Sequence, residues 1–143
     1  MKRNEFWCIV PFRVRYAETD QQGLLFNSHY LMYFDTVIVE YFRGLPYELQ
    51  TSKGAECDFH VVRALVEYRK PVYFDQEIDL GARVRRLGRS SITFELCMFG
   101  HDSSELSASG EVVWVNTEQR TKTAVPIPQQ LRELIQQRER LEH

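Results

Sequence analysis

A single carboxylate stands in a turn directly before a strongly apolar stretch of the chain. Asp20 follows Thr19 and precedes Gly23 by three residues, and ten of the thirteen residues from 30 to 42 are apolar or aromatic. If that stretch is a helix, its first backbone N–H groups lack intrahelical acceptors and lie at the positive end of the helix dipole. A developing oxyanion is stabilised at such a place while the nearby carboxylate handles the attacking group. The pattern therefore favours hydrolysis of an activated acyl group.

Three residues around this turn have more than one interpretation. An aspartate a few positions before a glycine is most often a turn former whose carboxylate binds nearby backbone N–H groups, and from the residues alone this interpretation fits Asp20. The side chain of Asn27 suits both capping of the helix and a contribution to catalysis. His29 could bind substrate or orient Asp20. We favour a packed and hydrogen-bonded histidine there, because that is the commoner state of a lone histidine beside an apolar helix.

The spacing of apolar residues predicts the elements that carry these side chains. Alternation of apolar and basic residues predicts a strand over 12–16, which leads the chain to Asp20. A helix is predicted over 30–42, with Ser28 as its N-cap and Gly44, followed by Pro46, as its end. The β-prone run at 37–39 leaves a strand as the alternative. A helix with so few polar residues must be wrapped by other elements.

A predicted loop at 45–58 precedes four more strands and a short helix. Close spacing of these strands predicts an antiparallel meander, and the alternation within them gives one buried and one polar face. A last helix after Pro126 and Pro128 has one apolar side, formed by Leu131, Leu134 and Ile135. The order predicts an α+β arrangement with one antiparallel sheet wrapped around a long central helix, which is close to the hotdog fold. The four strands are expected at 61–69, 77–87, 91–99 and 106–117.

Length and composition are those of one ordinary domain spanning 1–143. Eighteen basic and twenty acidic residues give a net charge of -2, which argues against nucleic acid or an anionic membrane as a partner. Cys8, Cys57 and Cys97 form no metal or disulfide pattern, so a reducing cytoplasm is the simplest location. His60 and His101 lack ligand-like spacing, and no metal is expected. No run is long enough for a signal-peptide core or a membrane span.

The turn and the segment after it match a known family pattern. This pattern is Tyr-x-x-Thr-Asp-x-x-Gly followed by an aromatic-rich helix, present here as Tyr16, Thr19, Asp20 and Gly23 and then Tyr30 and Phe34. Through these residues, the stretch 14–45 resembles the 4-hydroxybenzoyl-CoA thioesterase-like branch of the hotdog-fold acyl-CoA thioesterases, which includes Tol-Pal-associated members. Later blocks that resemble the same family are 59–63, 66–68, 87–91 and 126–128.

The resemblance implies an acyl-CoA thioesterase that forms a free carboxylic acid and CoA without a metal or redox cofactor. Asp20 would be its nucleophile or general base, and the backbone N–H of Asn27 would polarise the thioester carbonyl. The family also implies a homodimer or homotetramer with active sites between subunits, in which the strand containing Arg63 approaches from the neighbouring subunit. Residues expected to contact the substrate in this scheme include Tyr16, Gly23, Tyr30 and Arg63.

A basic cluster later in the chain is a candidate for the nucleotide end of CoA. Arg83, Arg85, Arg86 and Arg89 fall within seven residues. A solvated strand face is the simplest interpretation and accounts for some of them. CoA carries phosphate groups, however, and arginine side chains with neighbouring hydroxyl groups bind phosphate well. The residues that we expect at the CoA phosphates are Arg86, Arg89, Ser90 and Ser91.

Two further functions remain open at this stage. The first is a hotdog enzyme that acts on carrier-protein thioesters or as a dehydratase or hydratase, and the second is a non-catalytic acyl-binding protein. Dehydratase relatives combine a histidine with a carboxylate from a different site, and His29 does not match that pattern. The presence of Asp20 argues against a binding protein. Release of a free thiol from acyl-CoA distinguishes hydrolysis from both.

Overall fold

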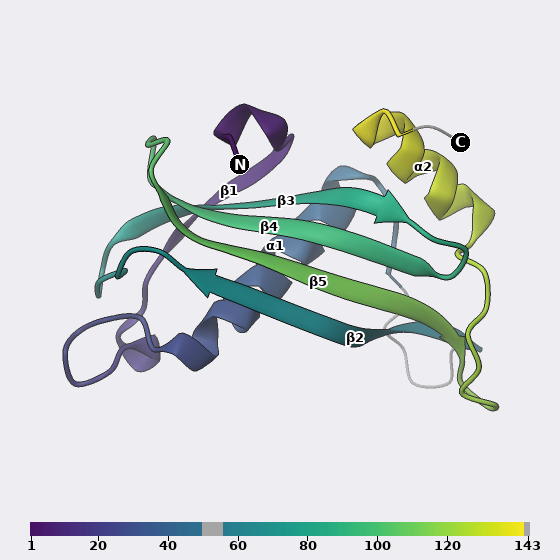
Figure 1. The fold of residues 1–143 in the computed structure, drawn as a ribbon, viewed down its shortest axis with the longest axis horizontal. Coiled ribbons are helices and arrows are strands. Elements are labelled where there is room, and N and C mark those ends of the chain that lie inside the picture. The colour runs from purple at the N-terminus through teal and green to yellow at the C-terminus, as the bar shows by residue number, and fades with distance from the viewer. Residues whose placement is uncertain (50–55, 142–143) are drawn as a thin grey trace.

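A five-stranded antiparallel sheet and one long helix make up most of the molecule (Figure 1). In this computed structural model residues 1–49 and 56–141 are described, so the predicted loop at 45–58 lies partly outside the described residues. The strand order across the sheet is β1-β3-β4-β5-β2, which leaves β1 and β2 at the edges. The elements are β1 (Cys8–Arg13), α1 (Tyr30–Gly44), β2 (Cys57–Tyr68), β3 (Glu77–Leu87), β4 (Ser91–Gly100), β5 (Leu106–Glu118) and α2 (Gln129–Glu139).

Helix α1 lies against one face of the sheet, behind it in Figure 1. The buried side chains of α1 recur three and four residues apart, and those of Tyr33, Phe34, Val37 and Ile38 have no exposed area. Burial of a large apolar side chain contributes about 1.5–3 kcal/mol, so this face fixes α1 on the sheet. The structure confirms the predicted helix and extends it by two residues, to Gly44.

The sheet of one chain covers only one side of α1, although the apolar composition of this helix predicted that other elements surround it on all sides. Leu31, Met32 and Val39 are 37%, 40% and 40% exposed on the other side. Five strands are too few to close around a helix, and the far side of α1 therefore keeps an apolar surface open to a further partner.

The predicted strand at 12–16 is wrong over most of its length. Strand β1 begins at Cys8 and ends at Arg13, which pairs with Glu77, the first residue of β3. The partner strand ends there, and the chain turns into a 3-10 helix at Tyr16–Glu18. Val14 is buried as predicted, but Tyr16 is 78% exposed. The four later strands are confirmed within a few residues of their predicted ends. The predicted meander holds for β3, β4 and β5, but β2 pairs with β5 and not with β3, the next strand along the chain.

The beginning of the helical segment also differs from the prediction. A 3-10 turn at Asn27–His29 precedes α1, and the extended residue before it is Phe26 (φ -70°, ψ 140°). Ser28 therefore lies inside the turn and is not an N-cap. Neither this turn nor α1 has a side-chain cap, which removes capping as a role for Asn27. The first N–H groups of the segment are left for other acceptors.

Helix α2 closes one end of the sheet. Its predicted apolar side is confirmed for Leu131 and Ile135, which are fully buried. A carboxylate oxygen of Glu139 accepts hydrogen bonds from the Tyr41 hydroxyl and from the backbone N–H of Val84, a β3 residue beyond the reach of β1. Within the described ranges, no helix has the length and hydropathy needed to cross a bilayer.

Candidate active site

Asp20 lies in a turn that its own carboxylate organises. Oδ1 of Asp20 accepts hydrogen bonds from the backbone N–H groups of Gln22 (2.8 Å) and Leu24 (3.2 Å). Gly23 adopts a φ of 73°, a left-handed conformation in which its N–H donates to the backbone carbonyl of Asp20. The turn-forming interpretation of Asp20 is thus confirmed for one carboxylate oxygen. The other oxygen, Oδ2, receives no hydrogen bond from the described part of the chain, which leaves it free to act on a substrate or water.

The second component is the start of the 3-10 turn that leads into α1. The N–H groups of His29 and Tyr30 donate to the carbonyl oxygens of Phe26 and Asn27. Across residues 1–49 and 56–141, no backbone acceptor pairs with the N–H of Asn27. The carbonyl oxygen of Asn27 also accepts a hydrogen bond from the Tyr68 hydroxyl (3.1 Å), which ties the turn to the end of β2.

A pocket of about 630 Å³ joins these two components. Tyr16 and Gly23, two of the residues expected to contact the substrate, line it, whereas Asn27 lies between two lining residues, Phe26 and His29. The ring of Tyr16 meets that of Phe74 edge-on at 5.6 Å. This site therefore combines a carboxylate, aromatic walls and the beginning of a helix. The lining residues are Tyr16, Thr19, Asp20, Gln21, Gly23, Phe26, His29 and Phe74.

Two of these features, Phe74 and Phe26, could not be predicted from the sequence, and a third, His29, had been interpreted differently. Phe74 comes from the segment before β3, and backbone bonds from Leu25 N to Val72 O (2.7 Å) and from Phe74 N to Gly23 O (2.8 Å) bring that segment to the turn. His29 lines the pocket, and its ring has no hydrogen-bond partner among the described residues, contrary to the interpretation we favoured. Phe26 is the residue before the 3-10 turn, and no sequence pattern indicated that it lines a pocket.

A buried acid under the turn was also missed. Glu18 is 7% exposed, and its carboxylate accepts hydrogen bonds from Arg15 Nε (2.8 Å) and the Tyr33 hydroxyl (2.8 Å). Burial raises the pKa of Glu18, but the hydrogen bonds from Arg15 and Tyr33 lower it by more, so the net pKa lies below the usual glutamate value. The carboxylate is therefore ionised at neutral pH.

Other predicted substrate residues lie away from the pocket. Tyr30 is buried, with its ring edge-on to that of Tyr68 at 4.8 Å. Arg63 is exposed on β2 and pairs with Glu111 of β5 at 2.5 Å. Arg86, Arg89, Ser90 and Ser91 lie around the β3–β4 turn, at the opposite end of the sheet from the Asp20 turn (Figure 1). One chain alone therefore does not bring the basic cluster to Asp20.

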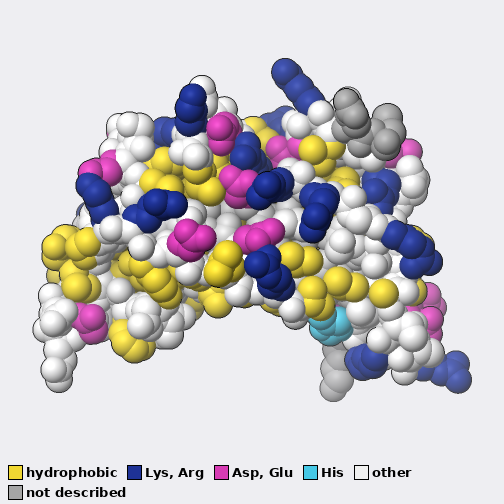
Figure 2. Space-filling view, viewed as in Figure 1, with side chains coloured by type: hydrophobic (Ala, Val, Ile, Leu, Met, Phe, Trp, Pro, Cys, Tyr) yellow, Lys and Arg dark blue, Asp and Glu magenta, His cyan; other side chains and the backbone are white. Residues whose placement is uncertain are grey.

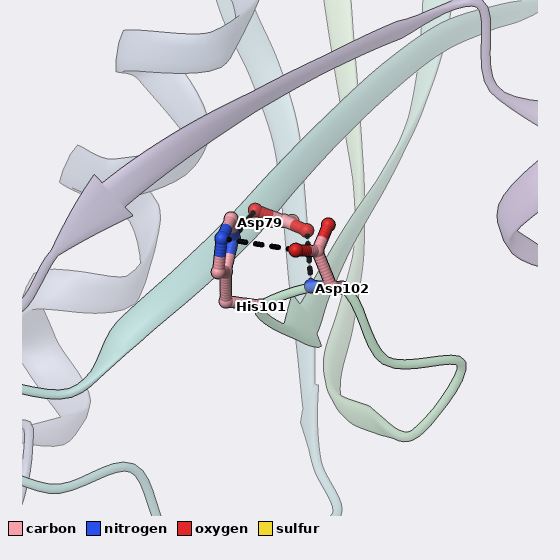
Figure 3. Close-up of side chains that lie close together, drawn as sticks. All are labelled: Asp79, His101 and Asp102. Atoms are coloured by element: carbon pink, nitrogen blue, oxygen red, sulfur yellow. Dashed lines mark hydrogen bonds and ion pairs between the residues drawn. The ribbon is translucent and has the colours of Figure 1, made fainter.

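A second cluster of titratable groups lies on the outer face of the sheet. Figure 3 shows Asp79, His101 and Asp102, whose oxygen and nitrogen atoms come within 4.8 Å of one another. Asp79 is 2% exposed and already holds the Arg3 guanidinium, the His101 ring (2.9 Å) and the Asp102 N–H (3.0 Å). These bonds fasten the N-terminal turn Arg3–Glu5 to the sheet, so the cluster serves the fold.

Comparison with known proteins places this geometry in a family. The profile of the thioesterase-like superfamily matches residues 14–135, which include the Asp20 turn, α1 and the whole sheet after β1. The chain belongs to the thioesterase-like superfamily. Thioester hydrolysis is accordingly its reaction class.

Relatives of this thioesterase-like chain support the assignment. The acyl-CoA thioesterase YbgC of Haemophilus influenzae is 26% identical over 117 residues, which cover 81% of this chain and 86% of that protein. A Pseudomonas aeruginosa protein of known crystal structure is 34% identical, with a TM-score of 0.82 over 94% of this chain and 92% of that one. A Thermus thermophilus thioesterase crystallised with coenzyme A and zinc is 27% identical, with a TM-score of 0.82 over 97% and 98%. The hotdog fold is thus confirmed.

Proposed function

We propose that this chain hydrolyses acyl-CoA thioesters to a carboxylic acid and CoA, with Asp20 and the backbone N–H of Asn27 as its catalytic groups. The observation that carries the proposal is a carboxylate with one free oxygen in the same pocket as the uncapped start of a helical segment. Acyl-CoA as substrate is also supported by the relatives that are named for acyl-CoA or crystallised with CoA.

The mechanism follows from where charge develops. As the thioester carbonyl is attacked, its oxygen gains negative charge and accepts a hydrogen bond from the Asn27 N–H. Oδ2 of Asp20 either attacks the carbonyl carbon, giving an acyl anhydride that water then hydrolyses, or takes a proton from the attacking water. In both routes the C–S bond breaks, CoA leaves as the thiolate and is then protonated, and the oxygen of water is incorporated into a carboxyl group. This chemistry requires no cofactor beyond the CoA of the substrate.

The proposal includes a homodimer formed through β2. Both edges of the sheet are open to pairing, but β1 contains Pro11, which lacks a donor N–H, and this disfavours β1 as a pairing edge. Hydrophobic side chains follow the lower edge of the molecule in Figure 2, where β2 lies. Val61, Val62 and Tyr68 of β2 are 55%, 60% and 53% exposed. Such an apolar edge favours a second copy of the chain as partner.

Symmetry then supplies the CoA site. A two-fold axis that pairs β2 with its own copy makes the two strands antiparallel, so opposite ends of the two sheets become neighbours. The β3–β4 turn of one subunit thereby approaches the Asp20 turn of the other. Arg86 and Arg89, with Ser90 and Ser91, are proposed to bind the CoA phosphates at the partner's site. A homotetramer of two such dimers fits equally, and a CoA substrate together with free Cys8, Cys57 and Cys97 favours a cytoplasmic location.

The test is release of free thiol from a panel of short, long and aromatic acyl-CoA esters, followed with a chromogenic thiol reagent. Asp20→Asn keeps the turn's shape but loses the base or nucleophile, and kcat is expected to fall by at least about 100-fold. Asp75→Asn is the matched control, since Asp75 is an exposed aspartate in the neighbouring segment that does not line the pocket. Near-normal turnover in Asp20→Asn would overturn the mechanism. Binding of acyl-CoA without turnover across the panel would indicate a binding protein instead. Turnover of carrier-protein thioesters alone would show that these, and not acyl-CoA esters, are the substrate.

A further inference from the structure

Two sets of backbone contacts hold the turn that carries Asp20. Only the inner set is also connected to the core by a side chain, that of Glu18. On the outer side, backbone bonds join Gly23 and Leu25 to the segment 72–74. On the inner side, the turn closes where Thr19 pairs with Leu25 and where the Glu18 carbonyl oxygen accepts the Phe26 N–H at 2.9 Å. Glu18 therefore stands at the junction of the Asp20 turn and the turn that begins at Asn27.

The side chain of Glu18 connects this junction to α1. One oxygen, Oε1, accepts hydrogen bonds from both Arg15 Nε and the Tyr33 hydroxyl at 2.8 Å, and the other lies 3.1 Å from Arg15 Nε. Tyr33 has no exposed area and packs its ring against Phe12 at a centroid distance of 4.7 Å. A carboxylate is rarely buried unless it is paired in this way, because desolvation of a charge is costly.

We propose that Glu18 is a positioning residue for catalysis, which sets the Asp20 carboxylate and the Asn27 N–H relative to each other by anchoring their shared junction to Tyr33. This inference rests on the proposed roles of Asp20 and Asn27. The two groups sit on adjoining turns, and a displacement of about 1 Å between such groups lowers rates by as much as about 100-fold. A rigid junction between them is thus a requirement of the mechanism.

The chain provides a matched control at the other end of α1. Glu139 is also a largely buried carboxylate that accepts a hydrogen bond from a tyrosine hydroxyl of α1, that of Tyr41 at 2.9 Å. It lies on α2 and closes the other end of the core. Loss of charge at Glu139 therefore reports the cost of removing a buried acid without touching the turn of Asp20.

The experiment measures kcat and KM for Glu18→Gln, Glu139→Gln, Asp20→Asn and the double variant Glu18→Gln/Asp20→Asn. In Glu18→Gln the amide group faces the Arg15 and Tyr33 donors with one acceptor oxygen in place of two, which loosens the junction. We expect kcat to fall about 10- to 100-fold with KM changed less than about twofold. Glu139→Gln is expected to lower Tm while kcat stays at the wild-type value.

The double variant separates positioning from a general loss of structure. If Glu18 acts through Asp20, adding Glu18→Gln to Asp20→Asn lowers the residual rate little further, because the two effects are not additive. Equal losses in both backgrounds would overturn the inference. Wild-type kcat in Glu18→Gln, beside a large loss in Asp20→Asn, would overturn it while leaving the proposed function intact. Wild-type kcat in Asp20→Asn would overturn the catalytic role proposed for Asp20, on which this inference rests.

A second variant covers the case in which Glu18→Gln does not fold. Tyr33→Phe removes only the hydroxyl and leaves Glu18 paired with Arg15. We expect a smaller loss of kcat, about threefold to tenfold, again with KM nearly unchanged and again absent from the Asp20→Asn background. A Tyr33→Phe enzyme with wild-type kcat would contradict the proposed link to α1.

Discussion

At the scale of single residues, Gly23 shapes the turn that presents Asp20. Its φ of 73° is a conformation that alanine adopts only with strain, yet a Cβ added at this position would meet no atom within 4 Å. The cost of Gly23→Ala is therefore conformational and not steric. We expect the free energy of unfolding to fall by about 1 kcal/mol, with a decrease in Tm on the order of 3 °C. The backbone N–H groups that bind the Asp20 carboxylate shift with the turn, so kcat should also fall, by about tenfold.

The control for this prediction is Gly23→Asn. Asparagine tolerates the left-handed region better than alanine does, so this variant should keep more of both Tm and kcat. Thermal unfolding followed by circular dichroism, with thiol release under saturating acyl-CoA, provides the two measurements. Equal losses in the two variants would show that the backbone conformation at Gly23 is not what matters.

Local spacing was enough to predict some site residues but not others. The Asp20 turn depends on residues within four positions, so the sequence carried both its turn-forming role and its place before a helix. Glu18 is different, because its burial depends on Tyr33, fifteen residues away, and on the packing of α1 beneath the turn. Phe74 reaches the pocket only through backbone pairing of 72–74 with the turn. No local pattern contains these contacts.

At the scale of elements, Asp79 fastens the N-terminal turn to the outer face of the sheet, and this attachment depends on pH. Burial raises the pKa of Asp79, but the hydrogen bonds from His101, Arg3 and the Asp102 N–H lower it by more, so the net pKa is below the usual value. The stabilisation is therefore present above the usual carboxyl pKa and is lost as pH falls. The hydrogen bond to Asp79 raises the pKa of His101. Its contribution is present below the usual histidine pKa and is lost as pH rises through the raised value.

These opposite signs define a window of greatest stabilisation, about pH 4 to 6.5. We expect the Tm difference between wild type and Asp79→Asn to be largest near about pH 5.5, smaller near about pH 8.5, where Arg3 is the only charged partner left, and smallest below about pH 3. His101→Gln should remove the decline between the two higher values. A Tm difference that stays constant from about pH 5.5 to 8.5 would contradict the pairing of His101 with Asp79.

The elements themselves were predicted well where alternation is uninterrupted and poorly at the ends of the sheet. Strand β3 was predicted with its observed bounds, because apolar and polar residues alternate along it. The end of β1 was not, since it is set by the first residue of its partner, Glu77, and not by the residues after Arg13. The 3-10 turn before α1 was missed for a similar reason. Its start is fixed by the bond from Phe26 to Glu18, not by a capping side chain at Ser28.

At the scale of the whole molecule, the far side of α1 and the edge strand β2 both carry exposed apolar side chains. Leu31 and Met32 of α1 and Val62 and Leu65 of β2 are all between 37% and 60% exposed. Single apolar residues scattered over a surface are ordinary. In the proposed dimer, however, the second chain would pair with β2 and cover α1, which would account for all four of these residues together. The proposed dimer would also account for the separation, within one chain, between Asp20 and the basic cluster at the β3–β4 turn. Both observations support the proposed dimer, in which each active site would be shared between two subunits.

Complementation between two inactive variants tests this sharing. Asp20→Asn destroys the reacting carboxylate, and Arg86→Glu/Arg89→Glu reverses the charge proposed to bind CoA. If the cluster serves the partner's site, a mixed dimer has one site with both defects and one with neither. Equal co-expression should then restore about a quarter of the wild-type activity at low acyl-CoA concentration, since about half of the dimers are mixed. Co-expression of Asp20→Asn with a chain that carries all three changes should restore none. Failure of the first pair, with mixed dimers confirmed by affinity tags on each chain, would show that Arg86 and Arg89 do not act across the interface.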